Sequence, residues 1–120
     1  MRYMLLMYRN EKEWEARPDR ERLAIRGEAI DVSETLRARG IHLAGDPLLP
    51  TTGAVTVRMS GGKPLATDGP FAETKEQLGG YAIVETPTID AAVAIALDHP
   101  LVRAGNHSIE VRPIRELPPR

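Results

Sequence analysis

Two segments of the chain are apolar on both faces of the strand that each is predicted to form. Residues 2–8, RYMLLMY, carry apolar side chains in both alternating sets. Residues 79–85, GGYAIVE, alternate Tyr81 and Ile83 with Ala82 and Val84. A strand of this kind needs cover on both faces. We therefore expect the sheet to be covered on both sides.

Helical periodicity marks two other segments. An apolar stripe with a spacing of four, three and four residues predicts a first helix over residues 19–39, which Gly40 is suited to end. The members of the stripe are Ile25, Ala29, Val32 and Leu36. A second helix is predicted from Thr88, a good N-cap, to the residues before Pro100.

The remaining patterns predict shorter strands and complete the fold. These strands cover residues 41–47, 54–59, 63–67 and 107–114, and an SGG turn joins the second and third of them into a hairpin. The order β-α-β, hairpin, β-α-β is typical of an α+β ferredoxin-like sandwich. We expect one domain over residues 1–120, with a loose tail at about residues 116–120.

Such a fold leaves one face of its sheet open, because two helices cover only the other face. An uncovered apolar face would favour aggregation. The pattern therefore predicts a homodimer in which two copies pack sheet to sheet through the open face. The alternative is that loops of the same chain close this face.

Composition narrows the function. The net charge is −1 with both signs interspersed, which argues against a direct nucleic-acid partner and against a polybasic membrane anchor. No apolar run approaches the length of a membrane span, and the absence of cysteine fits a cytoplasmic protein. The three histidines lack metal-ligand spacing, so we expect no metal and no cofactor.

The segment TDGPFAETKEQLGGY contains the first candidate for chemistry. Asp68 cannot make the usual Asx-turn bond, because the residue two positions on is Pro70, which has no N–H. Its carboxylate is therefore either part of a sharp structural turn or free to face a ligand in a cleft. Gly69 is expected to have an unusual backbone conformation, and Phe71, the only phenylalanine, to anchor the loop in the core.

His99 and Glu28 are the other acid–base candidates. His99 follows the second helix, whose C-terminal dipole would raise the pKa of a nearby imidazole; the alternative is simple capping before Pro100. Glu28 lies beside the apolar stripe of the first helix, where it faces a cleft or solvent. His42 and His107 have weaker claims. A tentative binding set comprises Gly69, Pro70, Phe71 and Tyr81.

The chain resembles the DGPF branch of the YCII-related (YciI-like) family. The resemblance rests on RYMLLMY, LRARGIHLAGDPL, TDGPFAETKEQLGGYAIVE and IEVRPI, and spans nearly the whole chain. It implies a dimeric α+β barrel of ferredoxin-like halves. In the family a His on the first helix and an Asp before a Pro have been proposed as a catalytic pair. Those places fall here near Glu28 and Ala29, and on His99, so the pair is either exchanged or lost.

Two functions follow from these observations. The first is a small-molecule enzyme or binder that uses Asp68, His99 and Glu28 for acid–base chemistry in one pocket. The alternative is a regulatory or interaction module without catalysis. The resemblance implies an association of such a module with an extracytoplasmic-function sigma-factor system.

Overall fold

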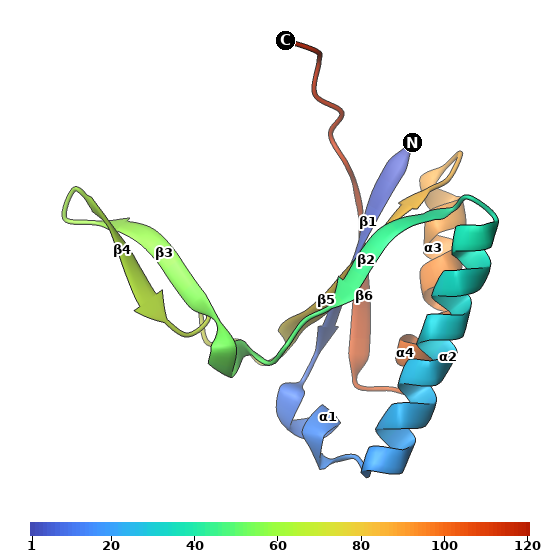
Figure 1. Ribbon diagram of the computed structural model, residues 1–120, viewed down its shortest axis with the longest axis horizontal. Coiled ribbons are helices and arrows are strands. Elements are labelled where there is room, and N and C mark those ends of the chain that lie inside the picture. Colours follow the sequence, from blue (N-terminus) through green and yellow to red (C-terminus); the bar gives the residue numbers. More distant parts are fainter.

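The computed structural model describes residues 1–120 and is built on a four-stranded antiparallel sheet with the order β2-β5-β1-β6 (Figure 1). Its strands are β1 (Arg2–Arg9), β2 (His42–Pro47), β5 (Gln77–Glu85) and β6 (His107–Pro113). The two segments that are apolar on both faces, β1 and β5, are the central strands. Their composition fits this position, since strands that are apolar on both faces need cover on both faces.

Helices cover one face of this sheet. They are the long helix α2 (Asp19–Ala38) and the helix α3 (Ile89–Leu97). The short helix α1 (Glu11–Ala16) precedes α2, and the short helix α4 (Pro100–Arg103) follows α3. Thr88 caps α3 by accepting a hydrogen bond from the amide of Ala91 at 3.3 Å. Gly40 has φ +74° after α2, the left-handed conformation that a glycine stop provides. The α+β class and the order of elements are confirmed.

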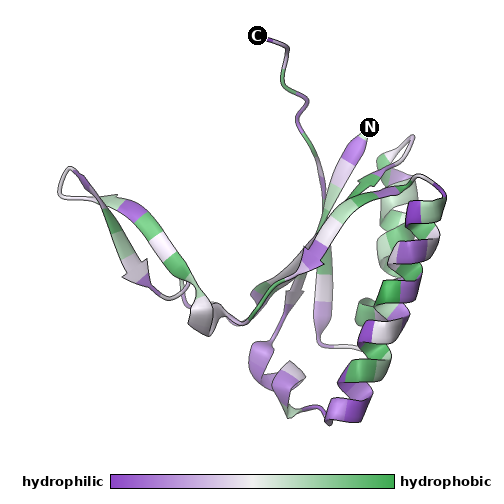
Figure 2. Ribbon diagram, viewed as in Figure 1, coloured by the Kyte–Doolittle hydropathy of each residue, from purple (hydrophilic) through white to green (hydrophobic).

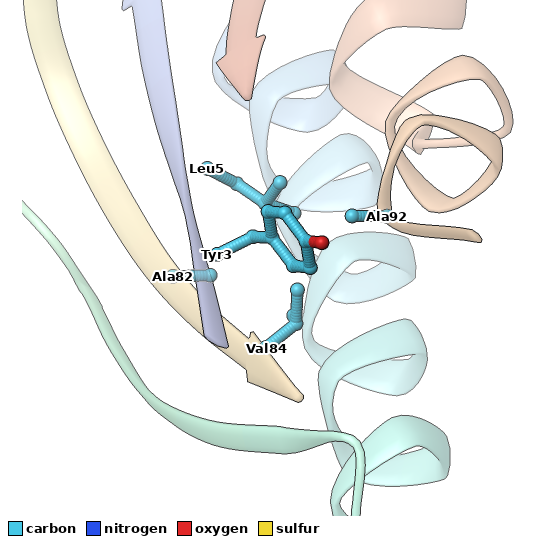
Figure 3. Packing of buried hydrophobic residues seen from close by; sticks show 5 residues of the cluster. All are labelled: Tyr3, Leu5, Ala82, Val84 and Ala92. Atoms are coloured by element: carbon cyan, nitrogen blue, oxygen red, sulfur yellow. The ribbon is translucent and has the colours of Figure 1, made fainter. Parts of the chain in front are cut away.

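The core lies between the sheet and α3. Five side chains form it: Tyr3, Leu5, Ala82, Val84 and Ala92 (Figure 3). They come from the two central strands and one helix, as the alternating and helical patterns require. Trp14 of α1 is fully buried as well.

A second sheet stands apart from the first. The strands β3 (Val55–Ser60) and β4 (Lys63–Asp68) pair only with each other, and the hairpin of residues 55–68, here called the arm, projects away from the body (Figure 1). A short 3₁₀ turn, η1 (Thr51–Gly53), precedes it. The radius of gyration is 16.3 Å, whereas a compact chain of this length has about 14 Å.

Phe71 does not anchor its loop in the core, contrary to the prediction. It is 73% exposed beside the base of the arm, and its carbonyl accepts a hydrogen bond from Arg58 at 2.7 Å. The hydrophobic preference of its ring is overridden because the loop leaves the body together with the arm. None of the helices is long and apolar enough to cross a membrane.

Candidate functional site

A cavity of about 300 Å³ lies between α2 and the sheet. Glycine makes this space on the sheet side, where Gly45 of β2 and Gly79 and Gly80 of β5 line the cavity without side chains. On the helix side, α2 has no fully buried residue and does not pack closely against the strands at this place. The remaining wall comes from α1, α4 and the ends of β1 and β6.

His99 lines this cavity and is 5% exposed. It is the N-cap of α4, and its Nδ1 accepts a hydrogen bond from the amide of Leu101 at 3.2 Å. Because Nδ1 is the acceptor, the proton of the neutral ring is on Nε2. Nε2 makes no hydrogen bond within the chain, so its N–H is free to donate to a ligand.

The pKa of His99 is lowered, which corrects the expectation from the helix dipole. Burial is the main cause, and the neighbouring positive charges of His107 and Arg103 act in the same direction. The dipole argument fails because the ring does not sit against the last carbonyls of α3. It bonds instead to the first turn of the next helix, where an N–H points at it.

His107 lines the same cavity. Its ring meets the ring of Trp14 edge to face, with the centroids 5.0 Å apart. Its Nδ1 is 3.3 Å from the carbonyl oxygen of Gly105, which only accepts, so Nδ1 carries the proton in that contact. Nε2 is enclosed without a partner. Burial is the main cause that lowers the pKa of this ring.

His42 is the third buried histidine of the cavity. Its claim from the sequence was weaker than that of His99, yet the structure places it in the cavity, where it is 7% exposed and its Nδ1 has no partner. Its Nε2 lies against Gly45, where an added Cβ would be 3.0 Å away. Burial, followed by the charge of Arg37, lowers the pKa of His42.

The residues proposed from sequence are not brought together around His99. Asp68 is the last residue of β4, at the base of the arm, and Gly69 and Pro70 follow it. None of the three lines the cavity. Glu28 is exposed on α2 and also lies outside it. The hypothesis that Asp68 and His99 share one pocket does not hold within a single chain.

Tyr81 borders the cavity, although alternation turns its side chain to the opposite sheet face from buried Ala82. Its hydroxyl donates a hydrogen bond to the carboxylate of Asp46 at 3.1 Å. That bond is the main reason for its raised pKa. The cavity and the open sheet face are therefore adjacent at this edge.

Sequence reasoning missed most of the residues that line the cavity. The charged and aromatic ones include Arg9, Trp14, Arg26 and Arg37, which come from β1, α1 and α2. One local signal was present in the sequence, the pair Gly79-Gly80 at the start of a strand: an added Cβ on Gly79 would lie 3.0 Å from Nε of Arg9. No group of three or more His, Asp or Glu side chains is arranged to hold a metal ion.

Comparison with known proteins agrees with this fold. The family model of the YCII-related domain matches residues 1–118. An uncharacterized protein of Rhizobium meliloti (strain 1021), R00369, is 45% identical over 67 residues, 56% of this chain and 54% of that protein. The match thus spans about half the length of this relative.

A solved structure shares the fold over nearly the whole chain. It is the 5-chloro-2-hydroxyhydroquinone dehydrochlorinase (TftG) of Burkholderia phenoliruptrix AC1100, in complex with 2,5-dihydroxybenzoquinone. The two chains have a TM-score of 0.58 and are 16% identical, with 96% of this chain and 94% of the other covered. At this identity the likeness concerns the fold alone.

Proposed function

We propose that this chain, which belongs to the family of YCII-related domains, is a homodimeric enzyme that acts on a small organic molecule by general acid–base catalysis. The observation that carries the proposal is the convergence of three buried histidines, His42, His99 and His107, on one cavity. Their pKa values are all lowered by burial, so the rings are neutral near pH 7. A neutral imidazole can accept a proton at one ring nitrogen and donate a hydrogen bond from the other.

The local geometry suggests different roles for two of them. His99 presents Nε2–H and serves as the hydrogen-bond donor that holds an oxygen of the ligand. His42 is the candidate base, because its Nε2 is not hydrogen-bonded within the chain. His107 is fixed through Nδ1 and supports Trp14. Proton abstraction coupled to isomerisation or elimination needs no more than such a pair.

The fold is compatible with this chemistry. TftG, which shares it, is named a dehydrochlorinase, and removal of HCl combines proton abstraction with loss of chloride. Its ligand is also small enough for a cavity of the size found here. This supports the reaction class proposed for the present chain and does not define its substrate.

The test is proton exchange in D₂O, followed by NMR over a panel of small ketones, hydroxyquinones and organic acids. We expect the wild type to catalyse exchange or elimination in at least one compound. His42→Gln and His99→Gln should each lower that rate by about 10²- to 10⁴-fold. Glu28→Gln, a change on the exposed side of α2, should leave it unchanged. A wild type inactive on the whole panel, or activity retained in both histidine variants, would contradict the proposal.

The homodimer is the second part of the proposal. The open sheet face displays apolar side chains that no helix covers, namely Met4, Leu6, Tyr8, Leu78, Tyr81 and Ile83. The arm adds an apolar face of its own (Figure 2). On it Val55, Val57 and Met59 are 60%, 66% and 65% exposed. One partner that accounts for both surfaces is a second copy of the chain.

Asp68 keeps a role only in that assembly. It pairs with Val55 across the arm, so the two residues lie on the same apolar face. If a second copy covers this face, Asp68 enters the interface, where its carboxylate needs a partner. The alternative function, a regulatory module, is favoured by the same exposed arm. It would be supported if hydrogen exchange showed the arm unprotected in a dimer joined by the sheets alone.

A further inference from the structure

Arg9 is a buried cation without a counterion. Its side chain is 8% exposed, makes no hydrogen bond or ion pair, and has an enclosed Nε without an acceptor. A guanidinium group keeps its charge even when it is buried. Buried charges in proteins are normally paired, because desolvation without compensation is costly. The partner of Arg9 is therefore expected to come from outside the chain.

Packing holds this guanidinium in place. It lies over the ring of Trp14, with Cζ 5.4 Å from the ring centroid. On the strand side, a Cβ added to Gly79 would be 3.0 Å from Nε and 3.1 Å from Cζ of Arg9. Gly79 thus leaves the space that the side chain occupies. Such support from both sides fixes a binding group before its ligand arrives.

The surroundings of Arg9 favour a negatively charged ligand. Arg26 lies over the same indole ring at 5.6 Å, lines the same cavity and also makes no ion pair. The indole Nε1 is a further enclosed donor without an acceptor. Arg37 adds a third unpaired cation to the lining. The enclosed Nε of Arg9 and Nε1 of Trp14 are donors, and Arg26 and Arg37 add exposed positive charges to the lining, which together an acceptor-rich anion would complement.

The nearby carboxylates are engaged elsewhere. Glu11 binds the amide and the hydroxyl of Thr51, both at 2.8 Å. Glu15 binds Arg22 at 2.7 Å. Asp46 accepts the hydrogen bond from Tyr81, and Glu34 lines the cavity but makes no ion pair. No acid of the chain therefore forms an ion pair with Arg9, and the charges of Glu11 and Glu15 reach it only from a longer distance.

We infer that Arg9 is the anion-binding residue of the cavity and that the ligand is a small organic molecule with a carboxylate or phosphate group. The planar fork of a guanidinium binds either group through two parallel hydrogen bonds. A space of about 300 Å³ limits the ligand to a single ring or a short chain. This inference rests on the proposed function, because it takes the same cavity as the ligand site.

Binding of probe molecules tests the inference. Trp14 is the only tryptophan and is packed against Arg9, so its fluorescence reports ligand binding. The probes are benzoate, phenyl phosphate and the neutral isostere benzamide. We expect at least one of the two anions to bind the wild type about 10-fold or more tightly than benzamide. Arg9→Gln should remove this preference while leaving the weak binding of benzamide.

Two further variants test whether the position of Arg9, and not the net charge of the protein, determines the affinity for the anion. Gly79→Ala should weaken binding of the anion without changing net charge, because the added Cβ displaces Arg9. Arg20→Gln removes a positive charge from the exposed surface of α2 and should leave the affinity unchanged. The inference is overturned if neither anion binds more tightly than benzamide, or if a folded Arg9→Gln protein keeps the preference. If neither anion is preferred while benzamide binding depends on His99, the inference about Arg9 is overturned and the proposed function is retained.

Discussion

His99 illustrates how one hydrogen bond fixes the role of a titratable residue. The Leu101 amide occupies Nδ1, so the neutral ring presents only Nε2–H to the cavity. Burial lowers its pKa and keeps this form present near pH 7. The Nε2–H group can donate a hydrogen bond to an oxygen of a ligand, and Nδ1, which could accept a proton, is occupied. The residue therefore suits ligand positioning better than proton abstraction.

NMR titration of the ring proton tests this assignment. We expect the His99 pKa to lie below the reference of about 6.5 and to be the same in wild type and Asp68→Asn. The residues are on different parts of the chain, and Asp68 does not line the cavity. His107→Gln should raise the His99 pKa, because a neighbouring positive charge is removed. A His99 pKa that falls in Asp68→Asn would show that Asp68 reaches it, which in a dimer means the arm of the partner.

The same pKa shifts predict a loss of stability in mild acid. Folded His42, His99 and His107 have lowered pKa values, so the unfolded chain binds protons more readily below about pH 6.5. Stability should be constant above that pH, fall as the pH drops toward the folded pKa values, and level off below them. Urea unfolding between about pH 5.5 and 7.5 measures this. His99→Gln should reduce the slope, and a wild-type midpoint independent of pH would contradict the shifts.

At the scale of elements, the turn after β4 depends on Gly69. This residue has φ +105°, a conformation that side chains rarely adopt, and its amide donates to the carbonyl of Ala54 at 2.7 Å. Gly69→Val should therefore destabilise the protein by about 1–3 kcal/mol. Ala72→Val, in the exposed loop that follows, should have a much smaller effect. Equal melting temperatures for the two variants would show that the turn does not need its glycine.

In the long helix α2, replacement of a glycine is expected to stabilise the protein. Gly27 lies in the helix interior, and an added Cβ would meet nothing within 4 Å. Gly27→Ala should raise the unfolding free energy by about 0.5–1 kcal/mol, because it restricts the unfolded chain and improves helix propensity. Gly40→Ala is the matched contrast: its φ of +74° makes the same substitution unfavourable. Denaturant midpoints of both variants would show the two opposite signs.

Local sequence patterns were sufficient to predict the helices and strands, but not the residues that line the cavity. Alternation in β1 and β5 and the spacing in α3 are properties of neighbouring residues, so the sequence reveals them directly. The cavity depends on contacts between distant ones, such as Arg9 with Gly79, and the pattern of either strand alone does not show them. His99 was identified from its place beside Pro100, but its hydrogen-bond partner was not. The family is confirmed, and its DGPF branch stays a prediction.

At the scale of the whole molecule, the chain has two uncovered apolar surfaces, the open sheet face and the arm. The extents of 49 × 48 × 20 Å describe a flat, extended body rather than a compact one. Only 14 of the 120 residues are buried in the single chain, so association is an effective source of further stability. The open face lies directly behind the strands that line the cavity, which links assembly to the site.

The dimer is tested by placing a charge on each surface. Ile83 points to the open face, opposite Met4 of β1, and Ile83→Asp should dissociate the dimer, since an unpaired carboxylate in a dry interface is costly. The monomer should remain folded, because the side chain then faces water. The wild type should show twice the 13.2 kDa mass of one chain in sedimentation or light scattering at micromolar concentration.

The controls separate folding from assembly. Val84→Asp places the charge one residue later on the buried face and should unfold the chain. Leu117→Asp, in the 79% exposed tail residue, should leave the dimer intact. Val57→Asp on the arm should weaken association if the arm packs on the partner, and leave it unchanged if the sheets alone form the interface. A wild-type protein that is a monomer at micromolar concentration would show that the open face needs no second copy.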